Sequence, residues 1–303
     1  MSQEIISEQD RSLLSKIFIS PDEPRLRAGW RLLLQTILYI LFGIIVFSVA
    51  ALLPLGTGSF SLLIQQVLNL VVVTGSVYVA RRWLDKRSFE SLGLTLSKQT
   101  WIDILAGIGI TFVQMGFIYS VMLTLGWLTF TGFAWQFDPI STVITSALAF
   151  FIAFVFVGWN EELLSRGYHL QTIASGLNLF WGIIISSAVF GLLHLGNPNA
   201  TWISAAGIFF AGIYLAYGYV RTKQLWLPIG LHIGWNFFEG VVFGFPVSGL
   251  DIYALLRIKI SGPELWTGGA FGPEAGLIVL PSLIVGGLLI YWFTMKRETI
   301  SNN

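Results

Sequence analysis

Two adjacent carboxylates follow a long apolar stretch of the chain. The sequence Asn-Glu-Glu-Leu-Leu-Ser-Arg-Gly, residues 160–167, comes directly after the apolar run 140–158 and places Glu161 next to Glu162. An ionised side chain at bilayer depth costs roughly 2.5–3.5 kcal/mol even on lenient insertion scales, so such residues tend to face a protein interior and to be functional. We therefore predict that Glu161 belongs to a catalytic centre.

Helical geometry gives the two carboxylates different roles. Glu162 and Arg166 are four residues apart, with the acid on the N-terminal side, which is the favourable order for an ion pair on a helix. Glu161 lies about 100° further round the same helix. We predict that Arg166 neutralises Glu162 as structural support and that Glu161 remains available for chemistry. For this motif alone, a salt-bridge cluster that merely ends the helix is an equally good interpretation.

Two of the three histidines lie in the apolar half that follows. His194 ends the sequence Phe-Gly-Leu-Leu-His, and His232 begins the sequence His-Ile-Gly-Trp-Asn, which places Asn236 on the face of His232. A lone histidine in a span is most often a hydrogen-bond partner between packed helices. Two histidines in neighbouring spans, with Glu161 and Asn236, favour one shared polar site. The depth of Glu161 and His232 agrees with this site, whereas His194 falls near the opposite membrane face.

The composition is that of an integral membrane protein. Of the 303 residues, 55% are hydrophobic and 11% are charged, against about 25% charged in a typical soluble domain. Segments near ~20 apolar residues cross the hydrocarbon core, and they must be helical because lipid offers no partner for the backbone. We predict an all-α bundle of about eight transmembrane helices. The predicted spans are residues 31–53, 62–80, 102–126, 141–159, 180–195, 202–220, 227–244 and 275–295.

The basic residues predict the orientation of these spans. Fifteen of the 17 Lys and Arg residues fall on the side that holds both termini, and only Arg257 and Lys259 fall on the other side. The positive-inside rule then places both termini in the cytoplasm. Glu161 would lie towards the cytoplasmic end of the fourth span, with the active site facing the cytoplasm. We expect residues 1–30 to form a cytoplasmic leader and residues 31–303 a single transmembrane domain.

The three motifs together resemble a known family. Glu161-Glu162-x-x-x-Arg166, Phe190-x-x-x-His194 and His232-x-x-x-Asn236 are similar, in order, to the signature motifs of the CAAX protease and bacteriocin-processing (CPBP) family. This family comprises the type II CAAX prenyl endopeptidases and their prokaryotic relatives. The basic stretch 81–94, which ends in Leu-Gly-Leu, is also similar to a loop that precedes the family core. The resemblance covers about residues 141–244, the protease-like core.

The resemblance implies an eight-span helical fold with a cytoplasm-facing cavity, and hydrolysis of a peptide bond in a membrane-associated peptide or protein. By motif position, Glu161 would be the general base and would hold a water molecule together with His194. His232 and Asn236 would bind the oxyanion of the tetrahedral intermediate. A positioned base contributes typically 10²–10⁴-fold, and an oxyanion donor about 2.7–4 kcal/mol.

A metal remains an alternative. Carboxylate and imidazole ligands suit Zn²⁺ with a fourth position open for water, so Glu161, His194 and His232 are a candidate ligand set for a metalloprotease. The chain has no His-Glu-x-x-His pair on one helix. We therefore favour metal-free glutamate catalysis slightly over a zinc mechanism.

Three further features complete the sequence-based expectations. Glu239 shares a helical face with Asn236, either supporting the site or hydrogen-bonding a neighbouring helix. We interpret His169 as a surface residue. The segment 245–274, with its amphipathic piece 251–260, is predicted to lie on the membrane surface and to carry no chemistry.

Other functions remain open. The alternative to a protease is a non-catalytic membrane scaffold or a bacteriocin self-immunity protein of the same fold. A transporter fits poorly, because the polar residues within spans cluster in the second half of the chain, whereas transporters often repeat them in both halves. The net charge of +1 gives no indication of a nucleic-acid partner, and the absence of cysteine excludes disulfides. We expect a prokaryotic plasma-membrane protein, and the sequence leaves open whether its substrate is prenylated.

Overall fold

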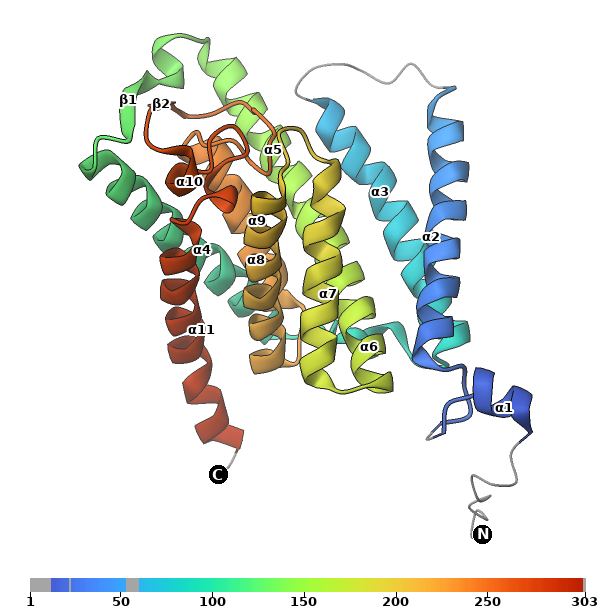
Figure 1. Ribbon diagram of the computed structural model, residues 1–303. Coiled ribbons are helices and arrows are strands. Elements are labelled where there is room, and N and C mark those ends of the chain that lie inside the picture. Colours follow the sequence, from blue (N-terminus) through green and yellow to red (C-terminus); the bar gives the residue numbers. More distant parts are fainter. Residues whose placement is uncertain (1–11, 22, 53–59, 302–303) are drawn as a thin grey trace.

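The computed structural model is a helical bundle with one small sheet at one end (Figure 1). It describes residues 12–21, 23–52 and 60–301, and the side chains up to residue 295. Residues 54–59 of the predicted loop 54–61, and residues 1–11 and 22 of the leader, therefore lie outside the described residues. A short helix, α1 (Leu13–Phe18), precedes the bundle. The longer helices of the bundle are α2 (Ala28–Ala50), α3 (Phe60–Val79), α4 (Lys98–Thr124), α5 (Ile140–Glu162), α7 (Leu179–Leu193), α8 (Trp202–Thr222), α9 (Trp226–Asn236) and α11 (Val279–Ser301).

Shorter turns extend or connect these helices. Three segments are π-helical, and each continues a preceding helix: η2 (Ala80–Leu84), η5 (Leu163–His169) and η7 (Phe237–Val242). The remaining short helices are η3 (Phe89–Leu92), η4 (Ala134–Gln136), α6 (Leu170–Gly176), η6 (His194–Gly196), α10 (Glu264–Thr267) and η8 (Pro273–Ala275).

Each predicted span coincides with one of these helices. Six helices among the described residues are long and apolar enough to cross a membrane, and Val279–Met295 is a shorter apolar helix. Residues 227–244 form α9 and η7, which are helical but shorter than a typical span. The prediction of a polytopic helical membrane protein is therefore confirmed, while the count of eight crossings stays a prediction.

The fourth predicted span is longer than the sequence suggested. α5, η5 and α6 form one continuous helical segment from Ile140 to Gly176, of 37 residues. The predicted end at residue 159 is wrong, because Glu162 and Arg166 are buried inside the protein and do not stop the helix at the interface. At about 1.5 Å per residue, roughly 22 Å of helix follows Glu161. Glu161 therefore lies well inside its helical segment.

Helix α9 is the central helix of the bundle. All of its residues, from Trp226 to Asn236, are buried. Glycines allow this burial: a Cβ on Gly107 of α4 would lie 2.4 Å from the backbone of Leu231, and one on Gly230 would lie 2.3 Å from the carbonyl oxygen of Ile104. Small residues that let two backbones approach are typical of helix packing in membranes. The contact between α4 and α9 fixes the helix that carries His232.

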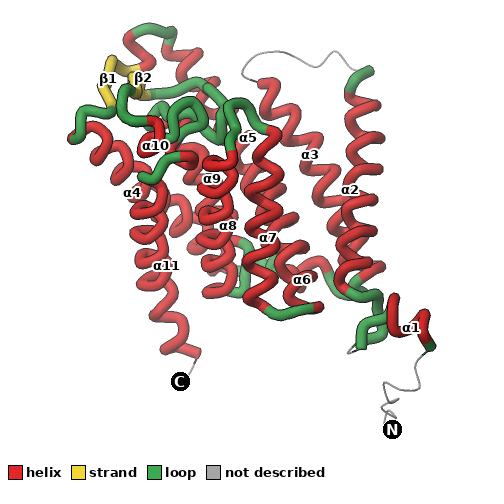
Figure 2. Tube along the Cα trace, in the orientation of Figure 1, coloured by secondary structure: helices red, strands yellow, loops and turns green. Residues whose placement is uncertain are grey.

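The sheet and the longest loop gather at one end of the bundle. Strands β1 (Leu128–Phe133) and β2 (Leu256–Ile260) pair antiparallel, with a bulge between Phe130 and Gly132. Figure 2 shows that they lie at the end opposite α1 and the C-terminal end of α11. Part of the piece 251–260 is thus a strand. The expectation of an amphipathic surface element is corrected there, because β1 supplies a backbone partner that the sequence did not reveal.

Candidate active site

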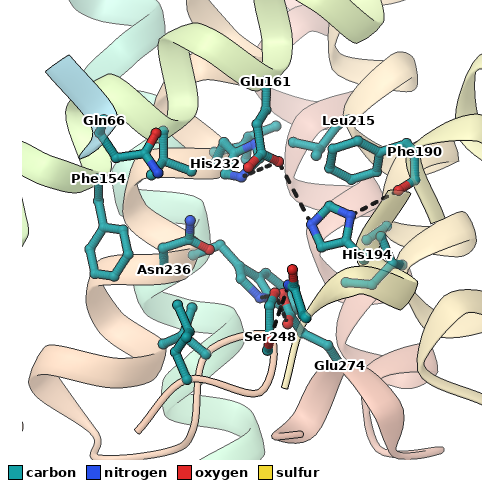
Figure 3. Close-up of a pocket in the computed structure, with 18 of the residues that line it drawn as sticks. Gln66, Phe154, Glu161, Phe190, His194, Leu215, His232, Asn236, Ser248 and Glu274 are labelled. Carbon is teal, nitrogen blue, oxygen red and sulfur yellow. Dashed lines mark hydrogen bonds and ion pairs between the residues drawn. The ribbon is translucent and has the colours of Figure 1, made fainter. Parts of the chain in front are cut away.

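A cavity of about 310 Å³ lies within the bundle, among α3, α5, α8 and α9 and under the loops that follow η6 and η7. Glu161, His194, His232 and Asn236 all line it (Figure 3). The four predicted side chains come from three separate helical segments, which end or bend at different depths. The structure therefore brings together every residue for which the sequence analysis predicted a direct catalytic role.

Glu161 faces both imidazoles. Its Oε2 atom lies 3.8 Å from Nε2 of His194 and 3.7 Å from Nε2 of His232. Oε2 is buried and accepts no hydrogen bond from the described residues. The two distances are too long for direct hydrogen bonds, but they place all three atoms within reach of one small molecule between them.

The second nitrogen of each imidazole is fixed by a partner. Nδ1 of His194 lies 2.8 Å from the carbonyl oxygen of Phe190, which can only accept a hydrogen bond. Nδ1 of His232 lies 2.8 Å from Oε1 of Glu162. Both Nδ1 atoms therefore carry the hydrogen, and both rings turn Nε2 towards Glu161. When the ring is neutral, this Nε2 is a hydrogen-bond acceptor.

Glu162 and Arg166 form the predicted ion pair. NH1 of Arg166 donates to Oε1 of Glu162 at 2.8 Å, and the two side chains are 1% and 0% exposed. NH2 of Arg166 donates to the carbonyl oxygen of Gly212 at 3.1 Å. Because Oε1 of Glu162 also accepts from His232, the ion pair is part of the support for that ring.

Phe190 connects the first two motifs. The guanidinium of Arg166 lies over its ring, 4.3 Å from the centroid, and its carbonyl oxygen holds His194. The aromatic residue of the second motif thus has a physical function: it covers the cation of the first motif and orients the histidine four residues later.

His194 reaches the site because α7 is short. Its last turn changes to the 3₁₀ segment η6, which begins at His194. The sequence analysis placed His194 too far from Glu161, because it ended the helix of Glu161 at residue 159. Since that helix continues to Gly176, both residues reach the same cavity.

The candidate metal ligands of the sequence analysis are Glu161, His194 and His232. No group of three His, Cys, Asp or Glu side chains placed to hold a metal occurs among the residues with described positions. The alternative set of Glu161, His194 and His232 therefore does not form a ready-made zinc site. We derive no chemical step through a metal.

Three cavity residues were missed by the sequence analysis. Ser248 and Glu274 come from the segment that was expected to carry no chemistry, and Trp235 lies between the predicted His232 and Asn236. Glu274 accepts a hydrogen bond from the Trp235 indole at 3.1 Å and one from the Ser248 hydroxyl at 2.5 Å. No motif marks these positions. The only signal in the sequence was a carboxylate next to an apolar helix.

The structure also places His169 and Glu239, the two further residues that the sequence analysis singled out. His169 is half-buried, lies 3.4 Å from Oε1 of Gln35 and lines a second cavity between α2 and α7. Glu239 is fully buried, and neither of its oxygens accepts a hydrogen bond from the part of the chain that is described. Of the two alternatives for Glu239, the hydrogen bond to a neighbouring helix is therefore not formed among the described residues.

The cavity lies at the end of the bundle that is poor in Lys and Arg. Its loop residues, among them Asn197, Ser248 and Glu274, belong to the segments 196–201 and 245–274. This end lies opposite α1 and the C-terminal end of α11 (Figure 1). The cavity is therefore nearer to the Lys- and Arg-poor end than the sequence analysis expected, because the continuous helix carries Glu161 away from the other end. The side of the membrane that the cavity faces stays a prediction.

Comparison with known proteins agrees with this geometry. Residues 143–238 match the family described as type II CAAX prenyl endopeptidase Rce1-like. This range contains all three motifs and the four predicted catalytic residues. The resemblance to the CAAX endopeptidase family is therefore confirmed. Glu274 and the sheet lie outside the matched range.

A curated relative supports the same assignment. Over 111 residues the chain is 32% identical to the "Putative membrane peptidase YdiL" of Bacillus subtilis (strain 168). The match covers 37% of this chain and 41% of the relative. The chain thus covers less than half of that protein. The apolar helices indicate an integral membrane protein, and residues 143–238 of it are similar to a peptidase family.

Proposed function

We propose that this protein is an intramembrane endopeptidase that hydrolyses a peptide bond in a membrane-associated peptide or protein. The observation that supports this most strongly is the position of Glu161, whose Oε2 faces both imidazoles at 3.7–3.8 Å within one cavity. A carboxylate beside two oriented imidazoles in an apolar interior is suited to activating water.

In the proposed reaction, Glu161 and His194 hold the attacking water. The water donates one hydrogen bond to the Glu161 carboxylate and one to Nε2 of His194. His194 accepts it because its Nδ1 is committed to the Phe190 carbonyl. Glu161 takes the proton as the water oxygen forms a bond to the carbonyl carbon. Proton abstraction by Glu161 is the largest contribution to the rate that we assign to a single side chain.

His232 and Asn236 are proposed to stabilise the oxyanion. Both are buried on the cavity wall, at 7% and 6% exposure. The Asn236 amide is a donor in its ordinary state, whereas Nε2 of His232 donates only when the ring is doubly protonated. The Glu162 carboxylate, 2.8 Å from Nδ1, provides the counter-charge for that form. Because both side chains are buried, such donors are worth more here than in solution.

The first test is direct cleavage. Purified protein in proteoliposomes should cut a membrane-anchored reporter peptide, and His194→Ala should lower kcat by at least about 10-fold with a smaller change in KM, because it loses orientation of the water. The measurement is the rate of product formation, with thermal unfolding recorded in parallel. Absence of cleavage by the unaltered protein, with every class of anchored peptide tried, favours the scaffold or immunity function.

We also propose an orientation for the molecule. Residues 31–303 form one membrane domain with both termini in the cytoplasm. Fourteen of the 17 Lys and Arg residues belong to the segments predicted for that side, while Arg166, counted there from the sequence, is buried inside the bundle. The cavity then lies in the outer half of the plasma membrane, and the substrate enters from that side. The protein would therefore cleave a membrane-associated peptide in its extracytoplasmic part.

Single cysteines test this orientation cleanly, because the chain has no cysteine of its own. Lys259→Cys on β2 and Lys98→Cys at the start of α4 are a matched pair, since both side chains are exposed at opposite ends of the bundle. An impermeant maleimide added to intact cells should label Lys259→Cys only, and permeabilised cells should show labelling at both. Labelling of Lys98→Cys alone in intact cells would reverse the orientation.

A further inference from the structure

A second buried carboxylate lines the proposed catalytic cavity. Glu274 is 5% exposed and comes from η8, outside the matched range 143–238. Figure 3 shows Glu274 in the same cavity as Glu161, across the space between the motif residues. No step in the reaction outlined above uses it.

Glu274 is held rigidly. Its Oε1 accepts from the Trp235 indole at 3.1 Å, and its Oε2 accepts from the Ser248 hydroxyl at 2.5 Å. Trp235 lies one residue before the oxyanion residue Asn236 on α9. A carboxyl group placed by two donors from separate elements has a defined direction within the cavity, which a proton donor to a reacting atom requires.

A third buried carboxylate, Glu239, interacts with Glu274. Glu239 is 0% exposed, and its interaction with Glu274 is electrostatic. The Trp235 indole is near both carboxylates, and its hydrogen bond goes to Glu274. Two buried carboxylates whose charges repel each other cannot both ionise without a large cost in free energy. We therefore expect the pair to keep one proton. Burial also raises the pKa of Glu274, against the opposing effects of Ser248, His194 and His232.

We infer that Glu274 is the general acid of the hydrolysis and that Glu239 keeps a proton available to it. The inference rests on the proposed function. Once Glu161 has taken a proton from water and the C–O bond has formed, the C–N bond breaks. As this bond breaks, the leaving nitrogen takes the proton of the Glu274 carboxyl group, so that it departs as a neutral amine. The proton on Glu161 passes through solvent to Glu274, so the cycle closes with one water consumed, one acid and one amine formed.

The chemistry of the leaving group tests this role. An amine is a poor leaving group unless its nitrogen is protonated. The alkoxide of an activated ester leaves readily without protonation. Glu274→Gln should therefore slow cleavage of an anchored peptide by at least about 10-fold and cleavage of the matching activated ester by less than about 3-fold. The unaltered protein is assayed on both substrates in proteoliposomes at several pH values.

The pH profile gives a second readout. A general acid must be protonated, so peptide cleavage should fall as pH rises through the pKa of this group, and Glu274→Gln should lack that alkaline limb. The charged or titratable groups that face Glu274 are Glu239 from η7, His194 from η6 and His232 from α9. Glu239→Gln is the companion variant. Glu239→Gln should shift the pH at which peptide cleavage falls, while the fall itself remains.

Controls separate positioning from proton transfer. Glu264→Gln changes an exposed carboxylate in the neighbouring α10 and should leave both rates unchanged. Equal slowing of amide and ester by Glu274→Gln would assign Glu274 a positioning role only and overturn the inference. Unchanged rates on both substrates would overturn it as well. If the unaltered protein cleaves neither substrate, the proposed function itself fails, which is a distinct result.

Discussion

Glu161→Gln should reduce kcat/KM for peptide cleavage by about 10²–10⁴-fold, because it removes the base that takes the proton from water while keeping the shape of the side chain. The fold should be retained. Oε2 of Glu161 accepts no hydrogen bond among the described residues, and the side chain is 34% exposed, so its neutral replacement leaves no buried ion unpaired. We expect the free energy of unfolding to change by less than about 0.5 kcal/mol.

The measurement is the rate of product formation in proteoliposomes, with thermal unfolding as the check on folding. Glu161→Asp is the informative companion, because it keeps the carboxylate but withdraws it by one methylene. Its rate should fall between those of the parent and Glu161→Gln, since small displacements of a catalytic group are costly. A correctly folded Glu161→Gln that cleaves at the parental rate would remove Glu161 from the mechanism.

Glu162→Gln should act mainly on stability. It leaves the Arg166 guanidinium, 1% exposed, in the interior without its carboxylate. Breaking a buried pair by removing one partner costs about 3–5 kcal/mol, because the remaining charge stays buried. The adjacent Glu161→Gln serves as the matched control, since it makes the same chemical change at a position without such a partner. The measurement is thermal unfolding in detergent or lipid.

A double variant separates stability from catalysis. Glu162→Gln with Arg166→Met removes both charges and should recover much of the lost stability, as replacement of buried pairs by apolar residues often does. Cleavage should remain reduced at least about 10-fold, because the remaining amide accepts from Nδ1 of His232 but supplies no counter-charge to the ring. If activity returned together with stability, Glu162 would be purely structural. If Glu162→Gln alone unfolded like the parent, the ion pair would not support the fold.

The motif residues could be predicted because their spacing is local. A four-residue interval places Glu162 beside Arg166 on a helix. Glu161 is unusual because it is a carboxylate at the end of a long apolar segment. The pairing of the two, and the convergence of Glu161 with His194 and His232, agree with expectations made from the sequence. Helix positions were also readable, because lipid forces the backbone to satisfy its own hydrogen bonds.

The remaining features depend on contacts between distant segments. The helix of Glu161 continues past residue 159 because its charged residues find partners inside the protein, and composition cannot show where a charge is buried. Strands β1 and β2 are separated by more than a hundred residues, so neither predicts the other. Glu274 enters the cavity through a loop whose path is set by such contacts. For the same reason the sequence did not show which end of the bundle the cavity is near.

The 37-residue segment that carries Glu161 has a further consequence. Drawn straight, it would measure about 55 Å, whereas the hydrocarbon core is about 30 Å thick. A segment that exceeds the thickness of its surroundings adapts by leaning or bending. The acyl-chain length of the surrounding lipids therefore affects the tilt of this helix in the membrane. A change in tilt would move the Glu161 carboxylate relative to the His194 and His232 rings.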